Sequence, residues 1–375
     1  MKVPLTKPEI SKNDIKIVTN SFESGWLAHG KYNKKFEIEF AKFIGTKYAV
    51  AVNSCTSALE LALWSNNINE GEVIIPSFTW VSTANVVKLC GCDPVFIDVD
   101  LKTRNIKAEE VEKAITNKTK ALIAVHFAGL PCDIISLRKV CKKYKILFIE
   151  DSAECIGGLQ KNHVAGSIGV GCFSFYPTKN LTTGEGGMVT SNSLKMVKKI
   201  KALSAHGIKN SAFERKKKKI SWYRNATYVG RNFRMPDPLA ALGISQLKKI
   251  DIMNKKRNII AKKYEKFFSE IKEIILQKAD NNYYHSYQMY SICIKGIDKK
   301  KFINFLNKKG IQASSHFDPP VHKQTAYKEY SKLRLKNTEI LSKYSISLPM
   351  YSNMSENMAN FVAKTFVKNY KKFLR

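Results

Sequence analysis

Five short apolar runs rich in β-branched residues recur along the first part of the chain, and their regularity limits the fold more than any other feature. They begin roughly 25 residues apart, which is the spacing of a strand, a crossover helix and the next parallel strand. Helix-like stretches separate them. The pattern predicts an α/β fold in which helices cover both faces of a mostly parallel sheet. The runs are Tyr48–Val52, Glu72–Ile75, Pro94–Asp98, Ala121–Val125 and Ile146–Ile149.

The remainder of the chain predicts a further strand of this sheet and then a second, smaller unit. The further strand is expected at 188–191. A long amphipathic helix at 251–271 leads into an α+β pattern that includes a strand at 289–294. We therefore expect a large domain over residues 1–250 and a small C-terminal domain over residues 251–375.

Basic residues are in large excess, with a formal net charge of +32. Such a charge attracts the phosphates of nucleic acids. However, the lysines are spread through every helical stretch, and the densest run, Arg215–Lys219, lacks the interleaved aromatic residues of a single-strand binding surface. This run lies in a polar stretch at 207–232 that we expect to be a long loop. The sequence predicts no nucleic-acid partner, whereas a small anionic substrate would benefit from the same field.

No segment of the sequence indicates a membrane, a disulfide framework or a metal centre. No apolar run reaches the roughly 18 residues that span a bilayer, and the residues from Met1 to Ser11 lack the pattern of a signal peptide. The eight cysteines lie mostly in apolar segments without CxxC spacing, and the histidines form no HExxH motif. We expect a cytoplasmic protein with reduced core cysteines, no membrane partner and no metal.

Lys179 is the candidate nucleophile of the chain. It follows a short apolar run of strand character and precedes a glycine cluster, within the segment Cys172–Gly187. A lysine at such a place can be held near a carbonyl group and form an imine with it. The alternative is a surface amine, since the chain has 63 lysines and arginines.

Three other segments offer groups that suit a phosphorylated, electron-poor ring. The hydroxyls of Ser54–Ser57 precede a helix and can bind a phosphate, although Ser57 with Glu60 also fits a simple capping box. Asp151 follows a buried run, where a carboxylate needs a cationic partner such as a pyridinium nitrogen, unless it is solvated in a loop. Trp80 could stack on such a ring, or it could be an ordinary core aromatic.

Short motifs follow one another along nearly the whole chain: Ser24–Gly30 with Phe36–Glu37, Ser54–Leu59, Pro76–Trp80, Glu150–Glu154, Ser174–Gly187, Gly230–Met235 with Ala240–Leu247, Pro319–His322 and Ser347–Met350. In this order they resemble the sugar aminotransferase family typified by the DegT, DnrJ, EryC1 and StrS proteins. The resemblance implies the type I fold of enzymes that depend on pyridoxal 5′-phosphate (PLP). In that fold a large domain with a mostly parallel sheet carries a smaller α+β domain at the C-terminal end.

The resemblance assigns a role to each candidate residue. Lys179 is similar to the lysine that forms an imine with PLP, Asp151 to the partner of the ring nitrogen, and Trp80 to the aromatic residue that stacks on the ring. The phosphate ligands that the resemblance implies are Thr56, Ser57 and Ser174. Asn232 is similar to an asparagine that reaches the cofactor phosphate of the neighbouring subunit, which implies a homodimer with shared active sites.

Two departures from the family pattern matter. Cys55 stands where the family usually has glycine, a modest change because the backbone donor survives. Glu154 stands where a glutamine or histidine commonly approaches the phenolic oxygen of the cofactor. We therefore count Glu154 among the cofactor-binding residues and expect it to be protonated or to turn away, since two anions repel in a site of low dielectric constant.

The resemblance implies a transaminase in which PLP alternates with pyridoxamine 5′-phosphate and glutamate is the expected amino donor. The acceptor would be a keto-deoxysugar carried on a nucleotide, for surface-glycan or aminosugar biosynthesis, and Trp26 and His322 would contact it. The pattern at 25–30 and the segment Thr182–Gly187 favour amination at C4 over C3. Two alternatives remain, a binding or regulatory protein without turnover and an enzyme of the same fold that does not act on sugars.

Overall fold

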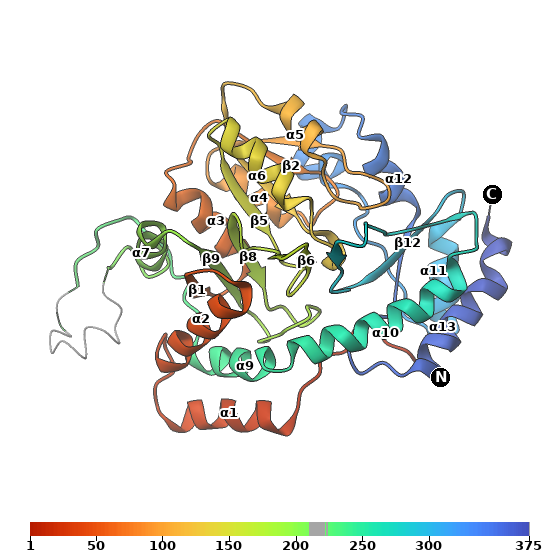
Figure 1. Ribbon diagram of the computed structural model, residues 1–375, viewed down its shortest axis with the longest axis horizontal. Helices are drawn as coiled ribbons and strands as arrows, with labels where there is room; N and C mark the ends of the chain where they lie inside the picture. The colour runs from red at the N-terminus through yellow and green to blue at the C-terminus, as the bar shows by residue number, and fades with distance from the viewer. Residues whose placement is uncertain (210–221, 223, 375) are drawn as a thin grey trace.

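A seven-stranded sheet forms the centre of the computed structural model, which describes residues 1–209, 222 and 224–374. The basic run Arg215–Lys219 lies outside the described residues. The strands lie in the order β1-β9-β8-β5-β4-β2-β3 (Figure 1). Their bounds are β1 Tyr48–Val52, β2 Glu72–Pro76, β3 Asp93–Ile97, β4 Thr119–Val125, β5 Leu147–Asp151, β8 Val170–Ser174 and β9 Gly187–Ser191. The five strands predicted from the apolar runs are all present.

The sheet is mostly parallel, as the sequence predicts. Every neighbouring pair from β8 through β5, β4 and β2 to β3 is parallel. Strand β9 is the exception, because it runs antiparallel to both of its neighbours, β8 and β1. The carboxyl ends of the parallel strands consequently meet at one edge, where α/β folds collect their functional groups.

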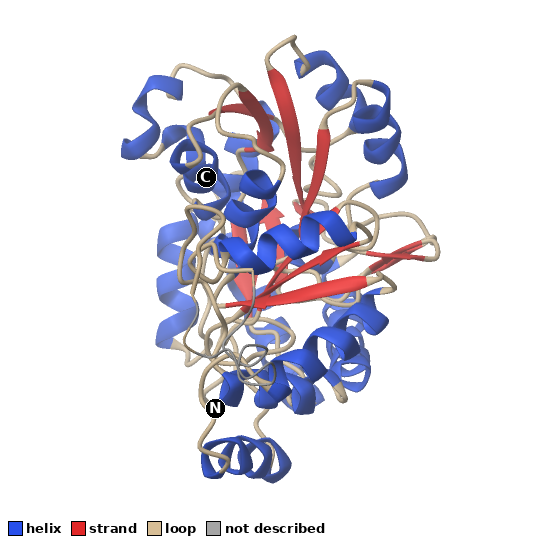
Figure 2. Cartoon of the chain, turned by 90° about the vertical axis from the view of Figure 1, so that its left-hand side faces the viewer, coloured by secondary structure: helices blue, strands red, loops and turns tan. Residues whose placement is uncertain are grey.

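Helices cover both faces of the sheet (Figure 2). Successive strand residues point to opposite faces, so Val73 and Ile75 pack in the core under α3, α4 and α7, whereas Ile74 packs with residues of α5 and α6 on the other face. The two-sided burial explains why the strands are continuous apolar runs rather than alternating ones. The helix bounds are α3 Cys55–Ser65, α4 Ser82–Leu89, α5 Ala108–Ala114, α6 Ile134–Lys143 and α7 Leu194–Leu203.

Four more helices follow the rim of the molecule, α1 Lys12–Glu23, α2 Lys31–Ile44, α9 Asp237–Leu247 and α10 Ile250–Phe268. Helices α2 and α9 cover the end of the sheet at β1, β9 and β8, where Phe40 of α2 meets Phe173 of β8 edge to face. In Figure 1, α9 and α10 run one after the other along the side opposite α5 and α6.

The C-terminal part has a small sheet and a core of its own. Its antiparallel strands lie in the order β10-β12-β13, and the bounds are β10 Ile274–Leu276, β12 Tyr290–Ile294 and β13 Ser345–Leu348. Helices α11 Lys299–Lys308, α12 Lys336–Tyr344 and α13 Glu356–Asn369 surround it. A third sheet joins β6 Leu159–Gln160, β7 His163–Val164 and β11 Tyr283–Tyr284. The division of the chain at residue 250 stays a prediction.

Short 3-10 turns complete the fold, η1 Phe127–Gly129, η2 Val321–Lys323, η3 Thr325–Tyr330 and η4 Tyr370–Phe373. All eight cysteines are buried free thiols, as expected. Within the described ranges, no helix is long and apolar enough to cross a bilayer. The same residues contain no cluster of three His, Cys, Asp or Glu side chains suited to a metal ion.

Candidate active site

Lys179 lies in the loop that leaves the carboxyl end of β8. Its Nζ is 3.6 Å from Oε1 of Glu154, and only 15% of its side chain is exposed, so it is no surface amine. The backbone N–H of Lys179 closes a turn by donating to the carbonyl of Tyr176. The next residue, Asn180, ties the loop to helix α10, because its amide donates to Oδ1 of Asn254 at 2.6 Å. The loop therefore holds the amine inside the fold.

Asp151 ends strand β5, and its carboxylate is buried at the same edge of the sheet. It accepts hydrogen bonds from Oγ1 of Thr83 (2.9 Å) and the N–H of Ala153 (3.2 Å). The thiol of Cys55 lies 3.8 Å from Oδ1, the oxygen that also accepts the N–H of Ala153. Burial raises the pKa of Asp151, and no Lys, Arg or His of the described residues forms an ion pair with it. The carboxylate is thus a buried acceptor that makes no ion pair with the described residues, although the amine of Lys179 acts on it electrostatically.

Helix α3 begins beside Asp151, one turn earlier than the capping box at Ser57 would place it. Its N-cap is Ser54, whose Oγ accepts a hydrogen bond from the N–H of Ser57 at 3.1 Å. The capping box of Ser57 with Glu60 was therefore wrong, because Glu60 instead pairs with Arg231 at 3.3 Å. The first N–H groups of the helix, with the hydroxyl of half-buried Thr56, are left at its open end, where an anion binds well.

Ser174 and Gly187 bring β8 and β9 against the start of α3. The two residues are paired in the sheet, and the hydroxyl of Ser174 accepts a hydrogen bond from the N–H of Tyr176. A Cβ on Gly187 would collide with the carbonyl group of Ser54 and lie 2.7 Å from the backbone nitrogen of Cys55. The close approach that glycine permits therefore places Ser174 next to the open end of α3.

Trp80 lies on the other side of this edge, just after β2. Its side chain is 62% exposed, and its ring centroid is 6.3 Å from that of Phe317. Because Thr83, three residues further on, contacts Asp151, the tryptophan lies near the same carboxylate. An exposed indole face at this place rules out the alternative of an ordinary core aromatic and leaves the ring free for stacking.

Glu154 turns toward the amine rather than away from it. While its Oε1 faces Lys179, its Oε2 accepts a hydrogen bond of 2.9 Å from the N–H of Ala128. Ala128 has a positive φ of 59°, which aims this N–H at the carboxylate. The cation of Lys179 and a backbone donor thus hold the carboxylate in the site, and its behaviour beside the phenolic oxygen of a cofactor stays a prediction.

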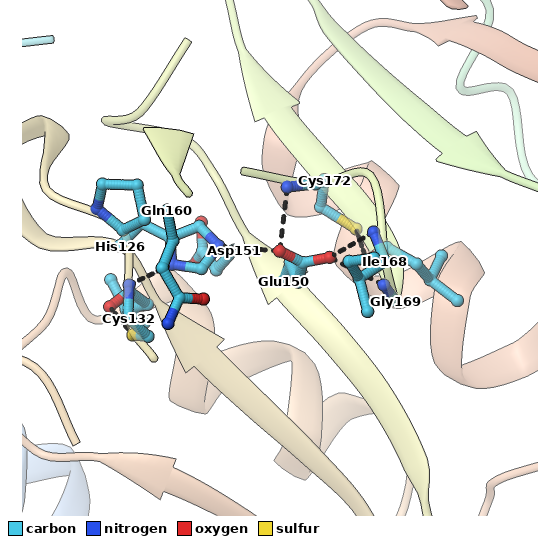
Figure 3. Close-up of polar contacts among 12 residues, drawn as sticks. His126, Cys132, Glu150, Asp151, Gln160, Ile168, Gly169 and Cys172 are labelled. Atoms are coloured by element: carbon cyan, nitrogen blue, oxygen red, sulfur yellow. Dashed lines mark hydrogen bonds and ion pairs between the residues drawn. The ribbon is translucent and has the colours of Figure 1, made fainter. Parts of the chain in front are cut away.

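A fully buried pair of hydrogen-bonded side chains, His126 and Glu150, supports the strands that carry these groups. His126 donates from Nε2 to Oε2 of Glu150 at 3.0 Å, since its Nδ1 accepts the N–H of Cys132 (Figure 3). Three further N–H groups, of Gly166, Ile168 and Gly169, donate to the same carboxylate. Burial opposes the charge of Glu150, but these bonds outweigh it and lower its pKa. Glu150 precedes Asp151 and fixes the end of β5.

Three of the predicted residues lie outside this cluster. Asn232 is exposed and accepts a hydrogen bond from Nε of Arg234 at 3.0 Å. Trp26 is half-buried, with its indole N–H directed at the carbonyl of His29. His322 is fully buried, 2.6 Å from the hydroxyl of Ser77, and burial lowers its pKa. Their contacts with a cofactor or a sugar stay predictions.

Sequence reasoning missed three residues that the fold brings to the site. Thr83 supports Asp151 directly. His316 lies within electrostatic reach of both Glu154 and Lys179, and Gln288 donates from Nε2 to the carbonyl of Thr178. His316 lies three residues before the motif at 319–322, the only sequence signal for it, and nothing near Gln288 in the sequence indicates its place.

Comparison with known proteins decides the family. The sequence model of the DegT/DnrJ/EryC1/StrS aminotransferase family matches residues 8–367. The chain belongs to this family. It is therefore a PLP-dependent aminotransferase, and the resemblance stated from the motifs is confirmed.

Relatives of the family extend over the whole chain. Spore coat polysaccharide biosynthesis protein SpsC of Bacillus subtilis is 39% identical over 95% of this chain and 94% of its own length. The structure of Helicobacter pylori PseC, an aminotransferase involved in pseudoaminic acid biosynthesis, matches with a TM-score of 0.90, 30% identity and full coverage of both chains. The PLP form of Spr1654, a putative sugar aminotransferase of Streptococcus pneumoniae, matches with a TM-score of 0.92, 27% identity and full coverage of both. These structures confirm the predicted fold class.

Proposed function

We propose that this aminotransferase moves an amino group from an amino acid to a keto-deoxysugar carried on a nucleotide, in the synthesis of a surface glycan or another aminosugar. One observation carries the proposal: the enclosed amine of Lys179 and the buried carboxylate of Asp151 lie within electrostatic reach at the same edge of the sheet. An amine and a buried acid in this arrangement suit the aldehyde and the ring nitrogen of PLP.

The residues of the site fit PLP in several independent ways. Asp151 offers a buried carboxylate that makes no ion pair with the described residues, and a protonated ring nitrogen would supply that partner. The phosphate would bind the open end of α3 with the hydroxyls of Thr56, Ser57 and Ser174. The exposed face of Trp80 would cover the ring. When bound, the cofactor supplies the electron sink that amino transfer needs.

The residues of the chain then have distinct tasks. Asp151 would hold the proton on the ring nitrogen, because a carboxylate in a buried site favours a charged partner. Nζ of Lys179 would hold the cofactor through its aldehyde, and as a free amine it would take up the proton from the α-carbon of the amino donor. Oε1 of Glu154 forms an ion pair with the free amine of Lys179.

The acceptor is proposed from the family and its named members. By their names, SpsC acts in spore coat polysaccharide biosynthesis and PseC in pseudoaminic acid biosynthesis. The net charge of +32 favours an anionic nucleotide sugar. The motifs at 25–30 and 182–187 favour a 4-keto over a 3-keto group. Mass spectrometry of the products from a panel of 4-keto and 3-keto nucleotide sugars tests this choice, and transfer to the 3-keto sugars alone would reverse it.

A homodimer with shared active sites is part of the proposal. The exposed amide of Asn232 lies in a segment that runs along the end of β1, since the carbonyl of Phe233 accepts the N–H of Asn53. From there it would reach the phosphate bound by a second copy. Mixing inactive Lys179→Ala and Asn232→Ala chains should restore activity, because each mixed dimer has one complete site. No restoration would show that Asn232 acts within its own chain or not at all.

Two other functions are separated from this one by simple measurements. A binding protein without turnover would not change colour when an amino acid is added to the PLP-loaded chain, whereas a transaminase bleaches as its cofactor is converted to the amine form. An enzyme that does not act on sugars would convert an amino acid and a keto acid but none of the nucleotide sugars. In each test the Lys179→Ala chain is the matched control.

A further inference from the structure

A chain of two buried hydroxyl groups ends on the carboxylate of Asp151. Oγ1 of Thr83 donates to Oδ2 of Asp151 at 2.9 Å, and Oγ1 of Thr79 lies 3.2 Å from Oγ1 of Thr83. Thr79 is 2% exposed and Thr83 is 1% exposed, so both hydroxyl groups are shielded from solvent. Thr79 lies in the loop after β2, Thr83 lies in the first turn of α4, and Asp151 ends β5. The fold thus brings three elements together at one carboxylate.

The direction of this hydrogen-bond chain follows from the number of protons. A hydroxyl group has one proton, and an ionised carboxylate can only accept. While Asp151 is ionised, Thr83 gives its proton to Oδ2 and its own oxygen is left to accept, so Thr79 is the donor to Thr83. Successive hydrogen bonds in a buried site polarise one another. Thr79 therefore strengthens the bond that Thr83 donates to the charged carboxylate.

The other oxygen of Asp151 has weaker neighbours. Oδ1 accepts the N–H of Ala153 at 3.2 Å and lies 3.8 Å from the thiol of Cys55. Burial raises the pKa of Cys55 and also that of Cys172, which the charge of Asp151 raises further, so both thiols keep their protons. Neither thiol brings a charge to the carboxylate, and the bond from Thr83 is the shortest of the three.

The charged side chains that act on Asp151 oppose each other. Burial raises the pKa of the carboxyl group most, and the hydrogen bond from Thr83 is the largest effect that lowers it. Of the ionisable side chains, Glu154 acts to raise this pKa and Lys179 acts to lower it. Because these two are themselves paired at 3.6 Å, they offer little net support for an ionised Asp151. The neutral hydroxyl chain supplies that support instead.

We propose that Thr83 and Thr79 are positioning residues that keep Asp151 ionised and thereby keep the proton on the ring nitrogen of bound PLP. One proton is shared between the carboxylate and the ring nitrogen, so it lies either on the nitrogen or on the acid. A hydroxyl donor stabilises the charged carboxylate more than the neutral acid, so it favours the proton on the nitrogen. The inference rests on the proposed function, because it needs PLP beside Asp151.

The first test uses the cofactor-free chain. Thr83→Val removes the hydroxyl group but keeps the shape, so the charged carboxylate loses its donor and the pKa of Asp151 rises further. The loss of Tm should be larger by about 2 °C or more near pH 8, where Asp151 is charged, than toward pH 4, where it takes up its proton. Thr190→Val is the matched control, because its buried hydroxyl group donates to the carbonyl of Gly166, which does not titrate. Its loss of Tm should be the same at both pH values.

The second test observes the ring nitrogen directly, in chains loaded with PLP that carries ¹⁵N at this position. The ¹⁵N chemical shift should be that of a protonated nitrogen in the wild type and in Thr83→Ser, which keeps the hydroxyl group. In Thr83→Val the balance should move toward the neutral nitrogen by about ten-fold or more, and kcat should fall with it while KM for the amino donor changes little. Thr79→Val should act in the same direction but less strongly, because it leaves the direct bond to Asp151 intact.

The inference is overturned by a loss of Tm in Thr83→Val that is equal at both pH values, or by a ring nitrogen that stays protonated in that variant. The double variant Thr83→Val/Asp151→Asn locates the effect, because its loss of Tm relative to Asp151→Asn alone should not depend on pH. A pH dependence that persists there would assign the effect to another group and would also overturn the inference. Should Thr83→Val fail to fold, Thr79→Val supplies both readouts with the same expected signs. A wild-type chain that binds no PLP would refute the proposed function itself.

Discussion

The amine of Lys179 lies 3.6 Å from the carboxylate of Glu154, and that carboxylate is anchored at its other oxygen by the backbone N–H of Ala128. The anchored side chain gives the amine a fixed partner inside the protein before any carbonyl compound is bound. The reacting atom is therefore held at the sheet edge instead of sampling the many rotamers of a free lysine.

Replacing Lys179 with alanine should lower kcat by about a thousand-fold or more, because the amine that links to the aldehyde and carries the proton is gone. Borohydride reduction of the PLP-loaded chain, followed by peptide mass spectrometry, should place the adduct on Lys179 alone. Lys301→Ala is the control, since its side chain is 77% exposed at the start of α11, and it should leave both results unchanged. An adduct on another lysine would contradict the assignment.

Asp151→Asn should lower kcat by about a hundred-fold or more, because an amide cannot hold the proton on the ring nitrogen. The same change should stabilise the cofactor-free chain near neutral pH. Burial raises the pKa of Asp151 above 3.8, so the folded state binds this proton more tightly than the unfolded state. The contribution of Asp151 to stability is thus fully present at acid pH and is lost as pH rises through the raised pKa.

Thermal unfolding of the cofactor-free chains as a function of pH tests whether the contribution of Asp151 to stability falls as the pH rises. The Tm of Asp151→Asn should exceed that of the wild type near pH 8, and the gap should close as the pH falls toward 3.8, the ordinary pKa of aspartate. A gap that widens on acidification would mean that the buried carboxylate is stabilised by a partner, contrary to the geometry.

Glu150→Gln should cost about 3 kcal/mol in the free energy of unfolding, because the NH₂ group of the new amide would face buried donors that now bond to a carboxylate. Since the pKa of Glu150 is lowered, the wild type should also lose this stability as pH falls through that pKa. Urea unfolding measures both effects. Glu110→Gln removes an exposed ion pair with Lys113 and should cost less than about 1 kcal/mol.

The strands and the two central site residues could be predicted because their signals are local. Asp151 was predicted as a site residue because it follows an apolar run of strand length. Lys179 was predicted because it follows a similar run and precedes a glycine cluster. Helix α3 was predicted directly after β1, but the serine that caps it was not, since Ser54 and Ser57 are both good caps and only the fold decides between them.

Contacts between distant parts of the chain could not be predicted. The bond from Asn180 to Asn254 joins residues 74 apart, and the bond from Gln288 to Thr178 joins residues 110 apart. Strand β9 pairs antiparallel with both β1 and β8, and no local pattern in the sequence predicts this pairing. The two hydrogen bonds, from Asn180 to Asn254 and from Gln288 to Thr178, orient the loop of Lys179.

Gly187→Ala should weaken the binding of PLP by about ten-fold to a hundred-fold while the chain still folds. The new methyl group would collide with the carbonyl of Ser54 and press on the nitrogen of Cys55, so the open end of α3 must move away from the bound phosphate and lose hydrogen bonds to a charged group. The Kd for PLP is measured from its absorbance. Gly184→Ala is the matched control, because it strains a positive φ of 83° in the same loop but meets no atom within 4 Å. An equal loss of affinity in both variants would mean that loop strain, and not the position of α3, governs the phosphate site.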